Sequence, residues 1–350
     1  MRGYGIVGAV VSRGTESPGA AIGLTFADRE LEDSVSAILG DVESLLVDSV
    51  VSANPLVTEA ARHLVDAGGK RFRPLLVALG AHFGDPRAEH VVRAASVVEL
   101  THLATLYHDD VMDEAAVRRG APSANARWGN SIAILIGDYL FARAADVATE
   151  LGIEAVRIQA RTFSRLVHGQ IAETAGPLEG EDAISHYLRV ISHKTGSLIS
   201  TSARFGGMFG GASQEQIEAL AVYGETFGTA FQLSDDLLDI ASESTQSGKT
   251  PGTDLREGVP TLPVLYALAS DDNDAASVRL REILAAGPVT DDDVHAEALG
   301  LLRESAALKR ARETVRGYAD RARSSLAPLP HVPARRALES LCDFIADRTG

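Results

Sequence analysis

Two aspartate clusters of identical spacing constrain this chain more than any other feature. The first is DDVMD at residues 109–113, and the second is DDLLD at residues 235–239. Both lie in apolar, helix-forming sequence, so the outer aspartates of each cluster share one helix face. Like charges at that spacing destabilise a helix, which suggests that cations bind there. The paired carboxylates belong to Asp109, Asp113, Asp235 and Asp239.

Carboxylate oxygens suit hard, oxygen-seeking ions, so the clusters predict binding of Mg²⁺. The middle aspartates, Asp110 and Asp236, point about 100° away from their partners on the helical wheel. We expect these two side chains to support the site rather than to bind the metal directly.

The apolar residues recur at helical spacing along most of the 350 residues, and only 5% of residues are aromatic. No Pro/Gly/Ser-rich linker divides the middle of the chain. The pattern therefore predicts one large all-α domain over residues 25–350. The expected helices cover about 27–51, 55–67, 72–84, 88–114, 123–149, 152–175, 181–190, 193–210, 214–241, 260–270, 273–286, 291–304, 306–326 and 333–347.

Residues 1–24 are expected to form a disordered extension. The apolar run 6–11 is too short for a secretion signal, and no stretch reaches the length of a membrane span. The single cysteine, Cys342, excludes an internal disulfide and fits a reducing compartment. We therefore expect a cytoplasmic protein. The net charge of −15 argues against nucleic acid as a partner, and much of it can simply confer solubility.

Basic residues gather at three places. Lys70-Arg71-Phe72-Arg73 opens a predicted helix, where cations are normally disfavoured by the helix dipole. Cations at a helix start make an anion site, whereas the alternative is a solvated basic turn. Arg118-Arg119 follows the first aspartate cluster, and Lys249 lies in the Gly/Ser/Thr-rich segment 242–258, predicted to be an irregular loop. Together with the aspartates, these cations predict a site for a metal-bound diphosphate.

Other chemistries lack support in the sequence. Cys342 has no local base, and the helical histidines are scattered. No P-loop and no dinucleotide-binding glycine fingerprint occurs. Metals and cations around a diphosphate would instead make it a better leaving group, because they neutralise the charge that develops in the transition state.

Five motifs of this chain resemble those of a known protein family. GGKRFRP, ELTHLATLYHDDVMDEAAVRRG, HKTG, FQLSDDLLDI and GKTPGTDLREGVPTLP occur in this order between about residues 30 and 348. Their order and content resemble those of the trans-polyprenyl diphosphate synthases. The resemblance implies a helical bundle around a central cavity, a homodimer, and about three Mg²⁺ ions held between carboxylates and diphosphate oxygens. It also implies head-to-tail addition of isopentenyl diphosphate to an allylic diphosphate, through ionisation, condensation and proton loss.

The resemblance assigns residues to these roles. Asp109, Asp113 and Asp235 match metal ligands, and Asp239 matches a position that acts through water. The isopentenyl diphosphate pocket is matched by Lys70, Arg73, His102 and Arg119. The allylic diphosphate and the cation formed from it are matched by Arg118, Lys194, Thr195, Gln232 and Lys249. Gln170 and Glu173 match a polar pair that faces the cavity, although a surface position is an open alternative.

One departure is visible. Many shorter-chain members carry a second lysine just before the TLP segment, but residues 256–261 read REGVPT. Its absence, which is common in longer-chain members, leaves the contacts near the second aspartate cluster less defined.

Product length should depend on the helix before the first cluster. By the same resemblance, Ala104 and Thr105 match the family's usual length-setting positions, with Thr101 one turn deeper, and all three are small. We therefore expect an open, apolar cavity and a long all-trans product of about C35 to C50 for a quinone side chain. If a floor exists, Tyr139, Leu140 and Phe141 are its candidates.

Four alternatives remain at this stage. A C15 or C20 synthase would share the chemistry, and a terpene cyclase or a squalene-type synthase would share the aspartates. The basic pocket argues against a cyclase, which needs no second diphosphate. A non-catalytic subunit of a heteromeric synthase would typically lack the aspartates. A di-iron bundle requires Glu-x-x-His pairs, which we do not find.

Overall fold

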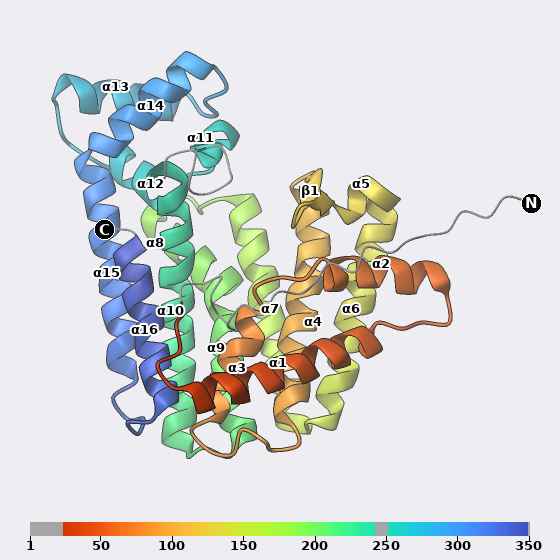
Figure 1. Cartoon of the computed structure of the whole chain (residues 1–350). Helices are drawn as coiled ribbons and strands as arrows, with labels where there is room; N and C mark the ends of the chain where they lie inside the picture. The colour runs from red at the N-terminus through yellow and green to blue at the C-terminus, as the bar shows by residue number, and fades with distance from the viewer. Residues whose placement is uncertain (1–23, 242–250, 349–350) are drawn as a thin grey trace, which may run out of the picture.

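The structure is a computed structural model that describes residues 24–241 and 251–348. Helices dominate it, as the apolar spacing predicts (Figure 1). The helices of the first half are α1 (Arg29–Ser49), α2 (Pro55–Asp66), α3 (Phe72–Ala81), α4 (Val91–Met112), α5 (Ala124–Trp128), α6 (Asn130–Glu150) and α7 (Ile153–Ala175). The second half contains α8 (Ala183–Ile191), the π-helix η2 (Ser192–Gly196), α9 (Ser197–Gly210), α10 (Gln214–Ala241), α11 (Thr253–Glu257), α12 (Leu262–Leu268), α13 (Ala275–Ala285), α14 (Asp292–Glu304), α15 (Ala306–Ser325) and α16 (Pro333–Arg348).

The most extensive packing joins α4 with α6, α9 with α10, α3 with α9, and α10 with α15. In Figure 1, α1 crosses in front of α3 and α4, while α13 and α14 extend beyond one end of the bundle. Most buried apolar residues form one continuous cluster that runs from α1 to α16. The prediction of an all-α bundle is therefore confirmed.

Local sequence explains several helix starts. Asp28, before α1, accepts a hydrogen bond from the Leu31 amide at 2.9 Å. Asn54 caps α2 in the same way, and Pro55 fills the first helical position, as expected from the sequence. Asp274 caps α13 with the Ser277 amide. Such caps satisfy amides that lack partners within the helix, so the boundaries follow from the sequence.

Three details differ from the expected helices or add to them. The predicted helix 123–149 is divided at Gly129, whose φ of +82° ends α5 before α6 begins. The connection before it contains a two-residue antiparallel pair, β1 (Val117–Arg118) with β2 (Ala121–Pro122). The predicted loop 242–258 contains helix α11, so this prediction is wrong for residues 253–257. Residues 1–23 of the expected extension lie outside the described residues, whereas Leu24 is buried in the core.

A seam of glycines joins α3 to α9. A Cβ atom on Gly206 would lie 2.3 Å from the Val77 carbonyl oxygen, and one on Gly80 would lie 2.9 Å from the Ala203 carbonyl oxygen. Backbone therefore meets backbone along this seam, which we call the glycine seam. Because interiors are close-packed, neither helix can shift without the other. The start of α3, which carries Arg73, is thereby fixed against the centre of the bundle.

Candidate active site

The first aspartate cluster lies at the C-terminal end of α4. Asp109 is half-buried, and Asp113 is exposed at the helix end. Burial raises the pKa of Asp109 to about 6, opposed by the positive charge of Lys194 and reinforced by the negative charge of Asp113. Asp110 faces away, as the helical wheel predicts: it is fully buried and accepts a hydrogen bond from Arg118 Nε at 2.6 Å.

The second cluster lies near the C-terminal end of α10. Asp236 is buried and accepts hydrogen bonds from the Tyr187 hydroxyl and, at 2.9 Å, from Gln232 Nε2. Burial raises its pKa to about 6. Asp239 accepts hydrogen bonds from the amides of Thr253 and Asp254 at 3.2 and 3.1 Å, which fixes the start of α11.

The remaining aspartate has a partner that sequence reasoning missed. Arg348, the last residue of α16, donates from Nη2 to Asp235 Oδ1 at 2.6 Å. Its Nε also donates to Ser234 Oγ at 2.6 Å, and its guanidinium lies over the Phe231 ring. Nothing in the local sequence connects positions 235 and 348, because the contact depends on how α16 packs beside α10.

The basic residues form a second cluster, at the start of α3 and around α4. Burial and the nearby Arg119 lower the pKa of Arg73 to about 10, opposed by Glu99. Burial and Arg73 also hold the pKa of His102 well below its usual value, so its imidazole is neutral at pH 7. Within residues 24–241 and 251–348, the buried Arg73 Nε has no hydrogen-bond partner. Lys70 is exposed at the edge of this cluster.

The backbone of Arg119 has a φ of +54°, in the left-handed region. Its Nη1 donates to the Leu64 carbonyl at 3.0 Å and also to the Gly68 carbonyl. The middle cation of the basic run, Arg71, is buried and paired with carboxylates. The structure therefore brings Arg73, His102 and Arg119 together. The guanidinium of Arg71 is occupied by carboxylates of the protein and is not available to bind a substrate anion.

The π-helix η2 explains the placement of Lys194 and Thr195. Lys194 Nζ pairs with Glu173, and Thr195 Oγ1 donates to Gln232 Oε1 at 3.2 Å. Insertion of one extra residue per turn is frequent at functional sites because it redirects side chains. Lys249, the remaining predicted cation, lies outside the described residues.

A cavity of about 410 Å³ lies beneath the first cluster, between α4, α6, α7 and α9. Four charged or polar side chains contribute to its lining: Arg73, Asp109, Gln170 and Lys194. The rest of its wall is largely apolar and is made by Thr105, His108, Val111, Met112, Ile134, Phe141, Phe163, Leu166, Val167, Ile171 and Leu198. Cationic groups and a largely apolar wall in one cavity suit an amphiphile with an anionic head.

The length-setting residues are placed differently from one another. Thr105 lines the cavity, but Ala104 is fully buried outside its lining. Thr101 is buried deeper and accepts a hydrogen bond from Gln159. Of the three predicted floor residues only Phe141 lines the cavity, where its ring centroid lies 4.2 Å from that of Phe163.

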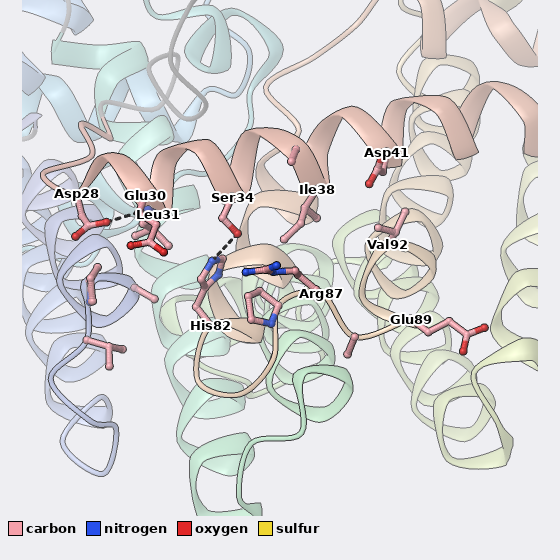
Figure 2. A pocket seen from close by; sticks show the side chains of 16 residues that line it. Asp28, Glu30, Leu31, Ser34, Ile38, Asp41, His82, Arg87, Glu89 and Val92 are labelled. Carbon is pink, nitrogen blue, oxygen red and sulfur yellow. Dashed lines mark hydrogen bonds between the residues drawn. The ribbon is translucent and has the colours of Figure 1, made fainter.

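A larger hollow of about 750 Å³ lies elsewhere, under the N-terminal half of α1 (Figure 2). Asp28, Asp41 and Glu89 stand at its edge, and His82 bonds Ser34 Oγ at 3.0 Å across it. None of the predicted site residues within the described ranges lines this hollow. Of these two cavities, the predicted site residues line only the smaller one.

The described residues contain no group of three or more His, Cys, Asp or Glu side chains close enough to hold a metal ion unaided. Each aspartate cluster supplies a few carboxylate oxygens at most. Within the described part of the chain, no helix is long and apolar enough to span a bilayer.

The chain is similar to proteins of one family. The family model "Polyprenyl synthetase" matches residues 54–302. A nonaprenyl diphosphate synthase of Mycobacterium tuberculosis is 53% identical over 329 residues, covering 94% of this chain and 97% of the relative.

Two solved structures show the same likeness. A geranylgeranyl pyrophosphate synthase of Corynebacterium glutamicum, complexed with calcium and isoprenyl diphosphate, has a TM-score of 0.85 at 45% identity and covers 93% of this chain and 100% of its own. A decaprenyl diphosphate synthase of Rhodobacter capsulatus has a TM-score of 0.82 at 35% identity, covering 92% and 99%.

The nonaprenyl and decaprenyl relatives support the predicted long-chain trans-prenyltransferase activity. The solved neighbours confirm the predicted isoprenoid synthase fold. With most of the chain matched, and with the predicted residues Arg73, Asp109 and Lys194 lining one cavity, this protein belongs to the polyprenyl synthetase family of prenyltransferases.

Proposed function

We propose that this protein joins isopentenyl diphosphate head-to-tail to an allylic diphosphate, with Mg²⁺ as the metal, and extends the product to about C35 to C50 inside an apolar cavity. The observation that carries the proposal is the lining of one cavity: Arg73, Asp109 and Lys194 line the same, largely apolar pocket. A metal-binding carboxylate, two cations and a hydrocarbon-compatible wall are what the two substrates require.

Asp109, Asp113 and Asp235 would hold the metal, with Asp239 acting through water. When bound, Mg²⁺ neutralises charge on the departing diphosphate. Burial has already raised the pKa of Asp109 to about 6, so its anion lacks solvation that a cation would replace. The donor set therefore fits a hard divalent ion.

The residues of this chain divide the remaining work. Lys194, Thr195 and Gln232, which lie close together, would hold the allylic diphosphate with Arg118 and Lys249. Thr195 and Gln232 are joined by their own hydrogen bond at 3.2 Å, so their polar atoms are oriented before substrate arrives. The proton lost in the last step would pass to the departing diphosphate.

Isopentenyl diphosphate would bind Lys70, Arg73, His102 and Arg119. The unpartnered and buried Arg73 Nε supports this assignment, since a buried donor without an acceptor costs free energy until an anion arrives. His102, neutral because of burial and nearby guanidinium groups, would donate a hydrogen bond without adding a charge.

The product chain would grow away from Asp109. Along α6, Phe141 lies seven residues beyond Ile134, a rise of about 10 Å. The Phe141–Phe163 ring pair therefore lies farther along α6 than Ile134, and Phe141 also packs against His108 of α4, with ring centroids 5.6 Å apart. We propose that small Thr105 admits the chain and that this ring pair is the first obstacle it meets.

We further propose a cytoplasmic homodimer. Ile134 and Leu135, near the start of α6, expose 43% and 60% of their surfaces. Exposed large apolar side chains beside a binding site suit contact with a second copy. The single cysteine, Cys342, is free and buried, which fits a reducing compartment.

A product assay tests the proposal. Purified protein would receive Mg²⁺, isopentenyl diphosphate and, separately, C10, C15 or C20 allylic diphosphates, and mass spectrometry would size the products. We expect a metal-dependent ladder that ends between C35 and C50, absent with chelator and in Asp109→Ala. A ladder that stops at C15 or C20 would refute the long product, and no elongation from any primer would refute catalysis by this chain alone.

A further inference from the structure

Arg71 lies between Lys70 and Arg73, the two residues at the start of α3 that are predicted to contact substrate, but its side chain has a different role. Arg71 is only 7% exposed, although Lys70 beside it is exposed. A guanidinium group carries five N–H donors, and a buried one must find acceptors for them. Whatever satisfies Arg71 also fixes the turn that presents Lys70 and Arg73.

Five acceptors surround this guanidinium. Nη2 donates to Glu43 Oε2 at 3.1 Å and to the Val65 carbonyl at 3.0 Å, while Nε donates to the other oxygen of Glu43. Nη1 donates to Glu99 Oε1 at 3.0 Å and to the Gly68 carbonyl at 3.4 Å. These acceptors come from α1, α2, the turn before α3, and α4, so Arg71 ties four segments together.

The backbone at this point is also constrained. Arg71 has a φ of +44° and a ψ of +38°, in the left-handed region. For a residue with a side chain this conformation is unfavourable, and it persists only where the surroundings hold it. The bidentate pair with Glu43 and the buried pair with Glu99 supply that hold.

Glu99 has a second effect on the same pocket. It is 2% exposed and lies one helical turn before His102. Burial lowers the pKa of both Arg73 and Arg119, and the negative charge of Glu99 opposes that lowering in each of them. The carboxylates of Glu43 and Glu99 thus lie near three guanidinium groups, those of Arg71, Arg73 and Arg119. The charges of these five groups sum to a net positive charge.

We propose that Glu43 and Glu99 are positioning residues: they hold Arg71, and Arg71 holds the turn from which Lys70 and Arg73 contact isopentenyl diphosphate. The inference rests on the proposed function of this pocket. Neither glutamate lines the cavity, and both are bonded to Arg71, so their effect should fall on the substrate that Lys70 and Arg73 bind. If the glutamates only stabilised the fold, their replacement would weaken the binding of both substrates together.

The test compares Glu43→Gln and Glu99→Gln with wild type, using Glu313→Gln, an exposed position on α15, as the matched control. We expect KM for isopentenyl diphosphate to rise about tenfold or more, with KM for the allylic diphosphate within about twofold of wild type. Calorimetric titration with isopentenyl diphosphate should show the same loss without turnover. The control should match wild type in both measurements.

A double-variant comparison asks whether Glu99 acts through Arg71. Arg71→Gln/Glu99→Gln should lose no more isopentenyl diphosphate affinity than Arg71→Gln alone, because both changes release the same turn. Losses that add independently would overturn the proposed route.

Loss of substrate binding must be distinguished from loss of folding in these variants. Removing one partner of a buried ion pair can unfold a protein, so Glu43→Gln, at a side chain that is 23% exposed, is the milder variant. Equal losses for both substrates in a folded variant, or unchanged affinity, would overturn the inference while wild-type elongation still upheld the proposed function. Wild type that binds no isopentenyl diphosphate would overturn both.

Discussion

Replacing Asp109 by asparagine should stabilise the metal-free protein while abolishing its activity. Burial raises the pKa of this carboxyl from 3.8 to about 6, so ionising it costs more in the folded state than in the unfolded chain. A shift of about two pKa units corresponds to about 3 kcal/mol. Asparagine keeps the shape of the side chain and removes this cost.

The sign of the effect depends on pH. Below about pH 4 the carboxyl is protonated in both states, and the two proteins should be equally stable. Between pH 4 and 6 the unfolded chain releases its proton first, so wild type loses stability relative to the variant. Above pH 6 the difference should reach its full value of about 3 kcal/mol. The pH dependence therefore separates an ionisation effect from a packing effect.

Urea unfolding of the metal-free proteins at pH 4.5 and pH 8 measures this difference directly. Asp113→Asn, the exposed partner four residues later, is the matched control and should change stability little at either pH. Mg²⁺ with a diphosphate should stabilise wild type and narrow the gap. A variant no more stable than wild type at pH 8, or a gap equal at both pH values, would refute the reasoning.

Three further predictions concern the cavity, the second aspartate cluster and the surface. Phe163→Ala should lengthen the longest product, because it removes one ring of the Phe141–Phe163 pair, and it should lower stability by about 3 kcal/mol. Mass spectrometry of the products measures the length, and an unchanged longest product would contradict the prediction. Arg348→Met should free Asp235 and lower the Mg²⁺ concentration for half-maximal activity by about threefold, whereas a higher requirement in a metal titration would show that Arg348 assists binding. Leu135→Arg, at an exposed apolar position, should reduce the mass in light scattering to that of a monomer, and an intact dimer would place the interface elsewhere.

Much of the fold and part of the site follow from local sequence. Helical spacing and caps such as Asn54 identify most helices, and the wheel places Asp110 away from Asp109. The division at Gly129 was missed because a single glycine in a helical pattern can be tolerated. Helix α11 was missed because its start depends on the Asp239 carboxylate, which is distant in sequence.

Long-range contacts account for the rest. The run at 70–73 looks like three equivalent cations, yet Arg71 is neutralised by Glu43 and Glu99, each 28 residues from it. Phe163 and Arg348 carry no local signal, because their positions depend on how whole helices pack. A sequence motif indicates which chemistry is present, while the assignment of each charge requires its neighbours in space.

The glycine seam between α3 and α9 has a consequence for how such an enzyme can diversify. Gly80 and Gly206 leave no space for a side chain, so substitutions along the seam would displace the helix that carries Arg73. Phe141 and Phe163 belong to α6 and α7, outside the seam, where a side chain of another size can change the depth of the cavity without displacing α3. Mutational tolerance should therefore be unevenly distributed: substitutions along the seam would disturb the helix that carries Arg73, whereas substitutions in α6 and α7 would leave that helix in place.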